Sequence, residues 1–291
     1  MSAIDFTALA KNFNKYNGRV VVLKCGGETL KNTEYVQEIA RQAAILKLLG
    51  CKPVVVHGGG PQINAALKLA GLEKKTDTDG MRITDSETMR ITKEQLDDTN
   101  LSLCRDFNKV VTSNDLAVRF VGLSSHDAEV ILGKKRGADN FTADVEAVST
   151  ARISRLINNT ESLSIPVVNP VSRDVETDGA VNVNADSAAA AIANSLRARR
   201  LLMFSDVSKG VQDAQGNRIA ELNEVLAHSL IADGVIEGGM RVKVETCLDV
   251  LQTGKVNGAV ILHPKDIADE MLTDSGAPSG TLIRLSSPNM S

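Results

Sequence analysis

Short, continuous runs of apolar residues recur along the chain. A run without polar alternation is typical of a strand that is buried on both faces of a parallel sheet. We predict such strands at Val20–Cys25, Val54–His57, Leu116–Gly122, Ile165–Asn169, Val181–Val183, Leu201–Ser205, Gly258–Leu262 and Thr281–Leu285.

The stretches between these runs carry apolar residues at helical spacing. Gly50 and Gly71 stop two of them, and Pro61 opens another at a first-turn position that tolerates proline. We predict helices at Ile4–Tyr16, Thr33–Leu49, Pro61–Ala70, Asp85–Val111, Thr150–Leu163, Ala185–Leu196, Asn223–Ile231 and Met240–Leu251. Strands that alternate with helices predict an α/β fold, a three-layer αβα sandwich with a mainly parallel central sheet.

Three segments depart from this alternation. Lys74–Thr84 is polar, which favours a small hairpin, and Glu129–Val148 is charged and interrupted by glycines, which favours peripheral strands. Turn-forming residues cluster over Asn169–Gly179. We place a boundary there between an N-terminal lobe, residues 1–178, and a C-terminal lobe, residues 179–291. One continuous domain is the alternative.

Composition narrows the class of protein. The 291 residues have a formal net charge of −3 and contain no tryptophan, which disfavours a nucleic-acid partner. No apolar run approaches the length of a membrane span, and the N-terminus lacks the apolar core of a signal peptide. The cysteines are widely spaced and form no CxxC pair, which indicates free thiols. We expect a cytoplasmic protein with neither a membrane nor a nucleic-acid partner.

Two glycine-rich turns near the start of the chain are the strongest chemical signal. VVLKCGGETL (Val21–Leu30) and PVVVHGGGPQ (Pro53–Gln62) each run from a predicted strand through glycines towards a predicted helix. Such a loop exposes backbone N–H groups, the helix dipole adds partial positive charge, and Lys24 adds a full charge. Glycines can also serve only to close a tight turn. Two such loops with a lysine favour a phosphate bound between neighbouring strands.

Better-known phosphate and hydrolase motifs are absent. The chain has no Walker A sequence, and Ile63 stands where GxGxxG requires its third glycine. The HGGG segment lacks the GxSxG nucleophile turn of esterases, and the HRD and DFG motifs of protein kinases are missing. We therefore expect a phosphate site of another lineage, with His57 packed or hydrogen-bonded beneath its loop rather than acting as a base.

Seven segments stand in a recognisable order: LKCGG, VVHGGGPQI, DGMRITDSETM, IPVVNPV, VNVNADSAAAAIA, FSDVSKGV and EGGMRVKVE. On these the chain resembles the amino acid kinase family from Val20 to Leu285. Arg82 in GMRIT, with Asn182 and Asn184 in VNVNAD, is most similar to the branch that acts on N-acetyl-L-glutamate. The resemblance implies the amino acid kinase fold and ATP-dependent phosphorylation of the side-chain carboxylate of N-acetyl-L-glutamate to an acyl phosphate, in arginine biosynthesis.

The resemblance also implies a catalytic set of Lys24, Lys243 and Asp186. Lys24 would stabilise charge on the transferring phosphoryl group, Lys243 would stabilise charge on the leaving side, and Asp186 would orient both lysines. The chemistry agrees, because a carboxylate is already an anion and needs no general base. Catalysis must instead align two repelling anions and neutralise the spreading charge. Asp186 taken alone would equally suit the first turn of the following helix.

Binding residues follow from the same resemblance. The nucleotide is expected at Gly26, Gly27, Gly59, Ser205, Asp206, Gly210, Gly238, Gly239 and Met240. The acyl substrate is expected at Gly59, Gly60, Arg82, Asn182 and Asn184, with Arg82 supplying a planar fork for a carboxylate. The resemblance assigns acyl-substrate binding and dimerisation to the N-terminal lobe and nucleotide binding to the C-terminal lobe. ATP brings Mg²⁺ with it, and we expect no dedicated metal site.

Several departures from the family pattern leave alternatives open. Lys209 looks inserted beside the nucleotide, which bears on the contacts to adenine or ribose. The departures lie at the rims of the site, and together they leave open another acylated amino acid, such as N-acetyl-aminoadipate, as the substrate. A sensor that binds nucleotide or arginine is the non-enzyme alternative. Arginine-sensitive relatives carry an N-terminal helix, which Ile4–Tyr16 would match, and an acid where Glu270 stands. We expect a homodimer, with a hexamer as the alternative and arginine as an open effector.

Overall fold

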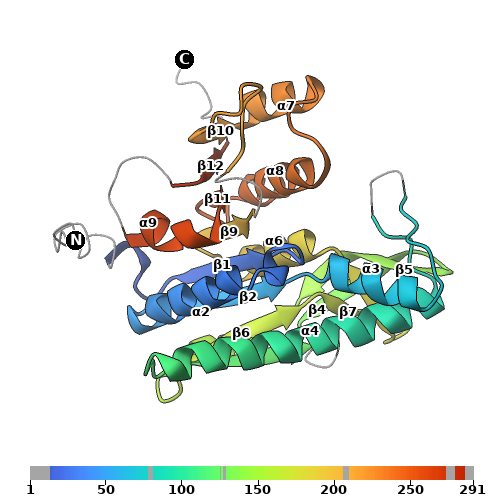
Figure 1. The fold of residues 1–291 in the computed structure, drawn as a ribbon, viewed down its shortest axis with the longest axis horizontal. Coiled ribbons are helices and arrows are strands. Elements are labelled where there is room, and N and C mark those ends of the chain that lie inside the picture. Colours follow the sequence, from blue (N-terminus) through green and yellow to red (C-terminus); the bar gives the residue numbers. More distant parts are fainter. Residues whose placement is uncertain are drawn as a thin grey trace.

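The computed structural model describes residues 14–77, 81–124, 126, 129–205, 210–272 and 279–285. A twisted central sheet runs through the molecule (Figure 1). From one edge to the other its strands are β10 (Glu221–Asn223), β12 (Thr281–Arg284), β11 (Ala259–Leu262), β9 (Arg200–Phe204), β1 (Val20–Cys25), β2 (Lys52–His57), β6 (Ser164–Asn169) and β3 (Arg119–Ser124). All neighbouring pairs from β11 to β3 are parallel, and β12 runs antiparallel to β11.

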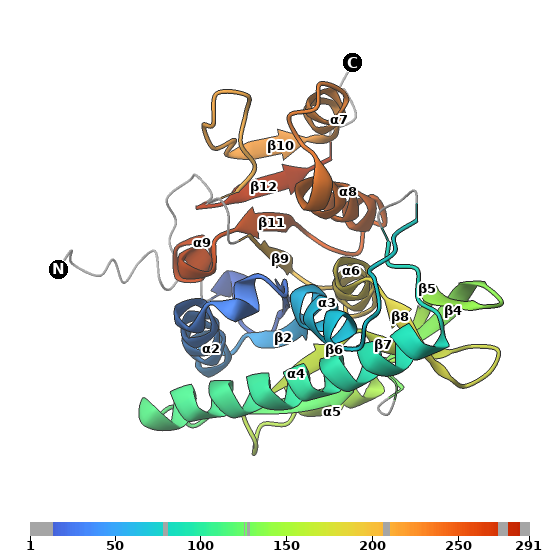
Figure 2. The ribbon, with the colours of Figure 1, turned by 45° about the vertical axis from the view of Figure 1, so that its right-hand side comes forward.

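Helices cover both faces of this sheet (Figure 2). One face carries α2 (Thr33–Leu48), α4 (Ser86–Ser113) and α9 (Ile267–Leu272). The other carries α5 (Ala151–Ile157), α6 (Ala185–Ser195) and α8 (Gly238–Gln252). Elsewhere α3 (Gly60–Leu69) packs on α4, α7 (Glu224–Ala232) lies beside β10, and single 3₁₀ turns form at η1 (Thr29–Lys31) and η2 (Pro264–Asp266). The three-layer α/β prediction is confirmed.

The central strands are buried on both faces, as their apolar runs predicted. In β1, Val21 and Leu23 pack with the α2 and α4 layer, whereas Val22 packs with the α6 and α8 layer. In β2, Val55 belongs to the first layer and Val54 to the second. Successive side chains of a strand point to opposite faces, so a strand between two helical layers carries apolar residues towards both of them.

Four further strands form a small closed barrel beside the main sheet. They are β4 (Ile131–Gly137), β5 (Asn140–Val148), β7 (Val171–Asp174) and β8 (Ala180–Val183). β4 and β5 are the peripheral strands that were predicted, and they pair with each other in antiparallel fashion. β7 was not predicted, because it lies in the cluster of turn-forming residues and carries no apolar alternation. It exists through pairing with β8, where Val171 lies opposite Asn182.

Two helices differ from prediction. α5 ends at Ile157 rather than Leu163, because the Asn159 side chain accepts hydrogen bonds from the backbone N–H groups of Glu161 and Ser162, which form a turn instead. α9 was not predicted, since its six residues are too few for a periodic signal. The predicted helix at Ile4–Tyr16 lies outside the described residues except for its last turn.

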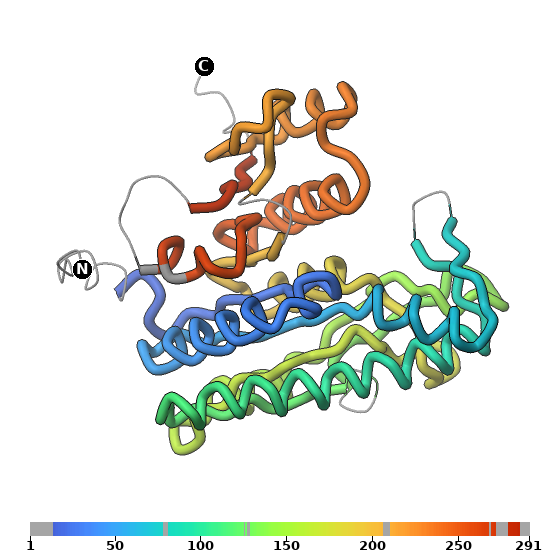
Figure 3. Tube along the Cα trace, in the orientation of Figure 1, coloured from blue at the N-terminus to red at the C-terminus, as the bar shows by residue number. Residues whose placement is uncertain are grey.

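The order of the strands sets the place of a binding site. On one side of β1 lie β2, β6 and β3, which come from the first part of the chain. On its other side lie β9, β11 and β12, which come from the last part (Figure 3). In an open α/β sheet, a crevice forms beyond the carboxyl ends of the strands where the direction of winding changes. That point lies at β1, whose carboxyl end leads directly into the first glycine loop.

All four cysteines are free and buried. Burial raises the pKa of the Cys25 thiol to about 12, although Lys24 beside it acts in the opposite direction. Such a thiol stays protonated and packs as a small apolar side chain. Across the residues that the structure describes, no helix combines the length and apolar character needed to cross a membrane.

The packing of α4 on β3 yields a test of the core. The rings of Phe107 on α4 and Phe120 on β3 are tilted at 54° with centroids 4.7 Å apart, and Phe107 is fully buried. Phe107→Ala should lower the free energy of unfolding by about 3–5 kcal/mol, because it removes apolar contacts and leaves a cavity. Leu101→Ala on the same helix is the control, since Leu101 is 61% exposed and should change stability by about 0.5 kcal/mol or less. Denaturant titration compares them, and equal losses would contradict this packing.

Candidate active site

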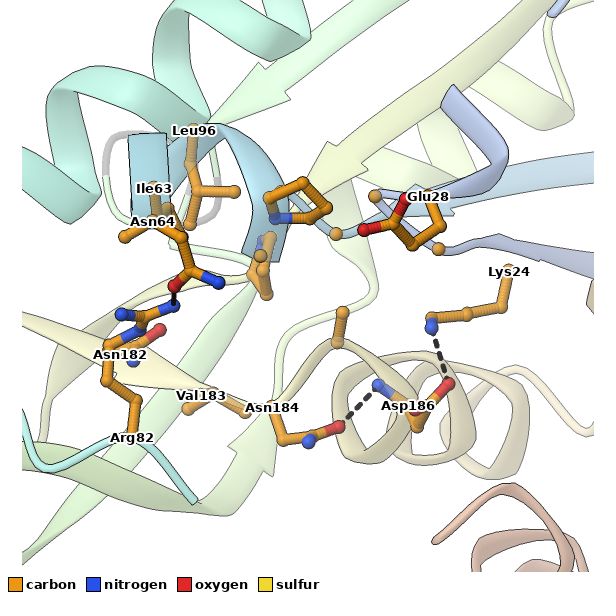
Figure 4. A pocket seen from close by; sticks show the side chains of 18 of the residues that line it. Lys24, Glu28, Ile63, Asn64, Arg82, Leu96, Asn182, Val183, Asn184 and Asp186 are labelled. Atoms are coloured by element: carbon orange, nitrogen blue, oxygen red, sulfur yellow. Dashed lines mark hydrogen bonds and ion pairs between the residues drawn. The ribbon is translucent and has the colours of Figure 1, made fainter. Parts of the chain in front are cut away.

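A cavity of about 400 Å³ opens at the carboxyl ends of β1 and β2 (Figure 4). Its wall includes ten of the residues predicted for catalysis or binding: Lys24, Gly26, Gly27, Gly59, Gly60, Arg82, Asn182, Asn184, Asp186 and Lys243. They come from both glycine loops, from the segment before α4, from β8, and from the starts of α6 and α8. The fold thus brings together residues that are up to 219 positions apart, from 24 to 243.

The two glycine loops touch each other at the floor of this cavity. A Cβ atom on Gly27 would lie 2.5 Å from Cδ of Pro61 and 3.0 Å from the backbone nitrogen of Gly60. The N–H of Gly58 donates to the carbonyl of Cys25 at 2.9 Å and ties the second loop to the first. Only glycine permits this approach, so the spacing of the two loops depends on the absent side chain.

Unbonded backbone N–H groups mark one part of the wall. α3 begins after Gly59 with a proline in its first turn and has no side-chain cap. Within the described part of the chain, the N–H groups of Gly59 and Gly60 donate to no protein acceptor. Free N–H groups at a helix N-terminus favour an anion, which fits the phosphate site expected from the glycine pattern.

Lys24 and Asp186 form a buried ion pair at one end of the cavity. The Lys24 Nζ and Asp186 Oδ1 atoms are 2.6 Å apart, and the two side chains are 5% and 10% exposed. Burial by itself would raise the pKa of Asp186, but the positive charges of Lys24 and Lys243 outweigh it and hold that pKa below its usual value. Asp186 is therefore ionised at neutral pH and holds Lys24 in place.

The first turn of α6 positions this carboxylate. Asn184 caps the helix, since its side-chain oxygen accepts from the N–H groups of Asp186 at 2.7 Å and Ser187 at 3.3 Å. Its amide nitrogen donates to the sulfur of Met81 at 3.6 Å, on the wall of the same cavity. Asp186 therefore stands in the first turn of α6 and at the same time contacts Lys24.

Arg82 lies at the other end of the cavity (Figure 4). Its Nη2 donates to Oδ1 of Asn64 at 2.5 Å, whereas Nη1 is buried and has no hydrogen-bond partner among the described residues. Burial lowers the pKa of Arg82, yet a guanidinium stays charged at neutral pH. A half-buried cation with an unused buried donor is suited to an anionic ligand. Asn182 is nearby and donates to Oγ1 of Thr84 at 3.2 Å.

The predicted polar hairpin brings Arg82 to this wall. Thr76 and Arg82 form an antiparallel bridge, and the carbonyl of Arg82 accepts from the hydroxyl groups of Thr84 and Thr142. Thr142 comes from β5, so the small barrel supports the arginine from behind. This support is a tertiary contact between segments 60 residues apart.

A second cavity, of about 520 Å³, adjoins the first through Lys243, which lines both. Its wall includes four more of the residues predicted for the nucleotide, Ser205, Gly210, Gly239 and Met240. Gly238 begins α8 with a φ of 52°, a left-handed conformation that favours glycine, but it does not line this cavity. Asp206 and Lys209 lie outside the described residues.

Sequence reasoning missed several residues of the first cavity. Asn64 on α3 holds Arg82, and Lys74, Met81 and Leu96 complete the wall. Asn64 occupies an ordinary polar position of an amphipathic helix, so no local signal distinguishes it. Lys74 belongs to a charged segment, in which the sequence does not distinguish one lysine from the next.

The chain is similar in sequence to known proteins. The sequence profile of the amino acid kinase family matches residues 19–262. An acetylglutamate kinase from Rhizobium rhizogenes is 38% identical over 305 residues, which cover 97% of this chain and 98% of that protein. One from Campylobacter curvus is 34% identical over 276 residues, which cover 93% of each.

Solved structures support the fold. N-acetylglutamate synthase from Neisseria gonorrhoeae, complexed with coenzyme A and L-arginine, aligns with a TM-score of 0.79 at 19% identity over 96% of this chain and 64% of that longer one. Carbamate kinase from Giardia lamblia, bound to AMP-PNP, aligns with a TM-score of 0.65 at 17% identity over 92% and 99%. From the profile match over most of its length and the relatives of 34–38% identity, the chain belongs to the amino acid kinase family.

Proposed function

We propose that this protein transfers the γ-phosphoryl group of ATP to the side-chain carboxylate of N-acetyl-L-glutamate, the reaction of an acetylglutamate kinase in arginine biosynthesis. The products are ADP and an acyl phosphate. One observation carries the proposal: a cavity holds an arginine with an unused donor at one end and a buried Lys24–Asp186 pair at the other, and Lys243 joins it to a second cavity.

The two cavities suit two anionic substrates. Arg82 offers its guanidinium fork to the α-carboxylate of the acyl substrate, and Asn182 lies beside it to bind the same carboxylate or the acetamido group. The side-chain carboxylate then points towards the glycine loops and Lys24. The nucleotide occupies the second cavity, with its γ-phosphate reaching the first past Lys243.

Catalysis in this arrangement is electrostatic. The attacking carboxylate oxygen forms a bond to the γ-phosphorus while the bond to the β,γ-bridging oxygen breaks, and the electron pair leaves with ADP. Lys24 and the N–H groups of Gly27 and Gly59 stabilise charge on the transferring group, and Lys243 stabilises charge on the leaving side. Asp186 keeps both lysines in position, which avoids reorganisation during the reaction.

Mg²⁺ enters this scheme as part of MgATP. Among the described residues, no group of three or more histidine, cysteine, aspartate or glutamate side chains is placed to hold a metal ion. Asp186, the buried acid of the cavity, is already paired with Lys24. The ion is therefore proposed to be held by phosphate oxygens, whose charge it partly neutralises.

Regulation and assembly are further proposals. Arginine is proposed as an effector that binds at Glu270. In the structure, the Oε1 atom of Glu270 lies 3.9 Å from Nε of Arg200. A homodimer in the cytoplasm is proposed, with a hexamer as the alternative, and residues 1–178 and 179–291 are proposed to divide acyl-substrate and nucleotide binding. The N-terminal residues that would join dimers into a ring lie outside the described part of the chain.

The reaction itself is directly testable. Purified protein with MgATP and N-acetyl-L-glutamate should release ADP and form an acyl phosphate that hydroxylamine traps as a hydroxamate. N-acetyl-aminoadipate, one methylene longer, is the control substrate. If only N-acetyl-aminoadipate yields a hydroxamate, that compound is the substrate instead. If neither compound leads to release of ADP, the result would favour a sensor.

Substrate binding can be tested at the arginine. Arg82→Lys should raise KM for N-acetyl-L-glutamate at least about tenfold with kcat changed less than about threefold, because a charged hydrogen bond worth roughly 1.5–3 kcal/mol is lost from ground and transition states alike. Arg90→Lys, an exposed arginine on α4, is the matched control. Steady-state kinetics separates the two constants. An unchanged KM for Arg82→Lys would exclude this role.

Transition-state stabilisation can be tested at the shared lysine. Lys243→Ala should lower kcat by about a hundredfold or more, the loss seen when a preorganised charge contact is removed. Lys255→Ala, an exposed lysine shortly after α8, should leave kcat unchanged. If Lys243→Ala retained kcat within a few-fold of the parent, Lys243 would have a different role.

A further inference from the structure

His57 is a fully buried histidine that the reaction scheme above does not use. It is the last residue of β2 and immediately precedes the second glycine loop. Its Nδ1 lies 3.1 Å from the carbonyl oxygen of Gly58, and its Nε2 lies 3.0 Å from Nδ2 of Asn100. Both ring nitrogens are therefore engaged.

The partners determine the proton positions on the ring. A carbonyl oxygen can only accept, so Nδ1 carries the proton and donates to Gly58. Nε2 is then the acceptor for the amide of Asn100, which also donates to the carbonyl of Val167 at 3.0 Å. Burial lowers the pKa of His57 to about 4, although the Gly58 carbonyl and the charge of Asp97 act in the opposite direction. The ring is thus neutral near pH 7 and has no free nitrogen with which to act as a base.

The bond to Gly58 bears directly on the loop. The structure has no cis peptide bonds among its described residues, so the carbonyl of Gly58 and the N–H of Gly59 lie in one peptide plane and point in opposite directions. With the carbonyl held towards His57, the N–H of Gly59 is turned away from the ring. Gly59 lines the first cavity, and its N–H has no acceptor in the described structure.

We propose that His57 is a positioning residue that holds the Gly58–Gly59 peptide with its N–H directed at the γ-phosphate. The identity of that ligand rests on the ATP-dependent function proposed above. Glycines flank the peptide on both sides, so its backbone has little conformational preference of its own. The N–H of Gly58 donates to the carbonyl of Cys25, which holds the preceding peptide in place. The Gly58–Gly59 peptide itself can rotate unless the carbonyl of Gly58 is also bonded.

Asn100 is in turn held against the neighbouring strand. A Cβ atom on Gly122 of β3 would lie 2.3 Å from Oδ1 of Asn100, so the asparagine fills the space that glycine leaves. Its donor to Val167 anchors it to β6. The sheet therefore fixes Asn100, Asn100 selects the protonation state of His57, and His57 orients the loop peptide.

Two substitutions separate orientation of the peptide from packing. In His57→Asn, the side-chain amide can donate from the place of Nδ1 but cannot reach Asn100. In His57→Gln, the amide can accept from Asn100 at the place of Nε2 but offers no donor to Gly58. Both variants are polar and neutral, and His228→Gln, at an exposed position on α7, is the control.

The readout is the affinity for AMP-PNP relative to ADP, both with Mg²⁺, measured by calorimetry. His57→Gln should lose about tenfold of the preference for the nucleotide with a γ-phosphate, as expected for one misdirected hydrogen bond to a charged group. His57→Asn should restore the preference to within about twofold of the parent. In turnover, His57→Gln should lower kcat about tenfold or more with KM for the acyl substrate changed less than about twofold.

The possible outcomes distinguish the positioning role of His57 from its alternatives. Equal losses of γ-phosphate preference in both variants, or no loss in either, would overturn the positioning role, as would a parent protein that binds AMP-PNP and ADP equally. The kcat ratio of His57→Asn to parent should be constant between pH 5.5 and 8, and a ratio that varies with pH would indicate a titrating base instead. If the nucleotide pattern holds but N-acetyl-L-glutamate yields no hydroxamate, the positioning role stands and the proposed substrate fails.

Discussion

The buried ion pair between Lys24 and Asp186 is the interaction on which the site depends. It joins the end of β1 to the first turn of α6, and the two side chains are only 5% and 10% exposed. A buried charge is tolerated only with a partner, and removal of one partner typically costs 3–5 kcal/mol. The glycine loop after Lys24 and the Asn184 cap before Asp186 hold the two groups at this distance. In the proposed mechanism, the pair keeps the ammonium group of Lys24 directed at the transferring phosphoryl group.

The proposed reaction brings together two anionic substrates, which repel each other. Cations at Arg82, Lys24 and Lys243 are distributed along the two cavities, where their positive charge would offset that repulsion. Backbone N–H groups add hydrogen-bond donors that need no side chain, but the backbones of the two glycine loops must then approach each other closely. Glycine at position 27 makes that approach sterically available. The absence of a base in the proposed mechanism agrees with a carboxylate nucleophile.

The pattern of apolar runs predicted the inner strands of the central sheet, β1, β2, β6, β9 and β11, because their apolar residues are buried on both faces. It did not predict the edge strand β10, which has three residues of which the first and last are exposed. It was less successful where tertiary contacts override local preference. β7 arises from pairing with β8 within the small barrel, and α5 is cut short by a turn at Asn159. The glycine loops were predicted as phosphate sites because glycine, lysine and the start of a helix have a direct physical meaning in the order in which they occur.

The sequence by itself determined the chemical groups of this protein: the two glycine loops, Lys24 before the first of them, and the alternation of strands and helices that places their carboxyl ends on one edge. Tertiary structure alone decided how these groups meet. It paired Asn64 with Arg82, placed Lys243 between two cavities, and bonded Asn100 to His57. The physical reason is that chain periodicity reports burial and local conformation, whereas side chains 18, 43 or 162 residues apart come into contact only through packing of the whole sheet and its helices.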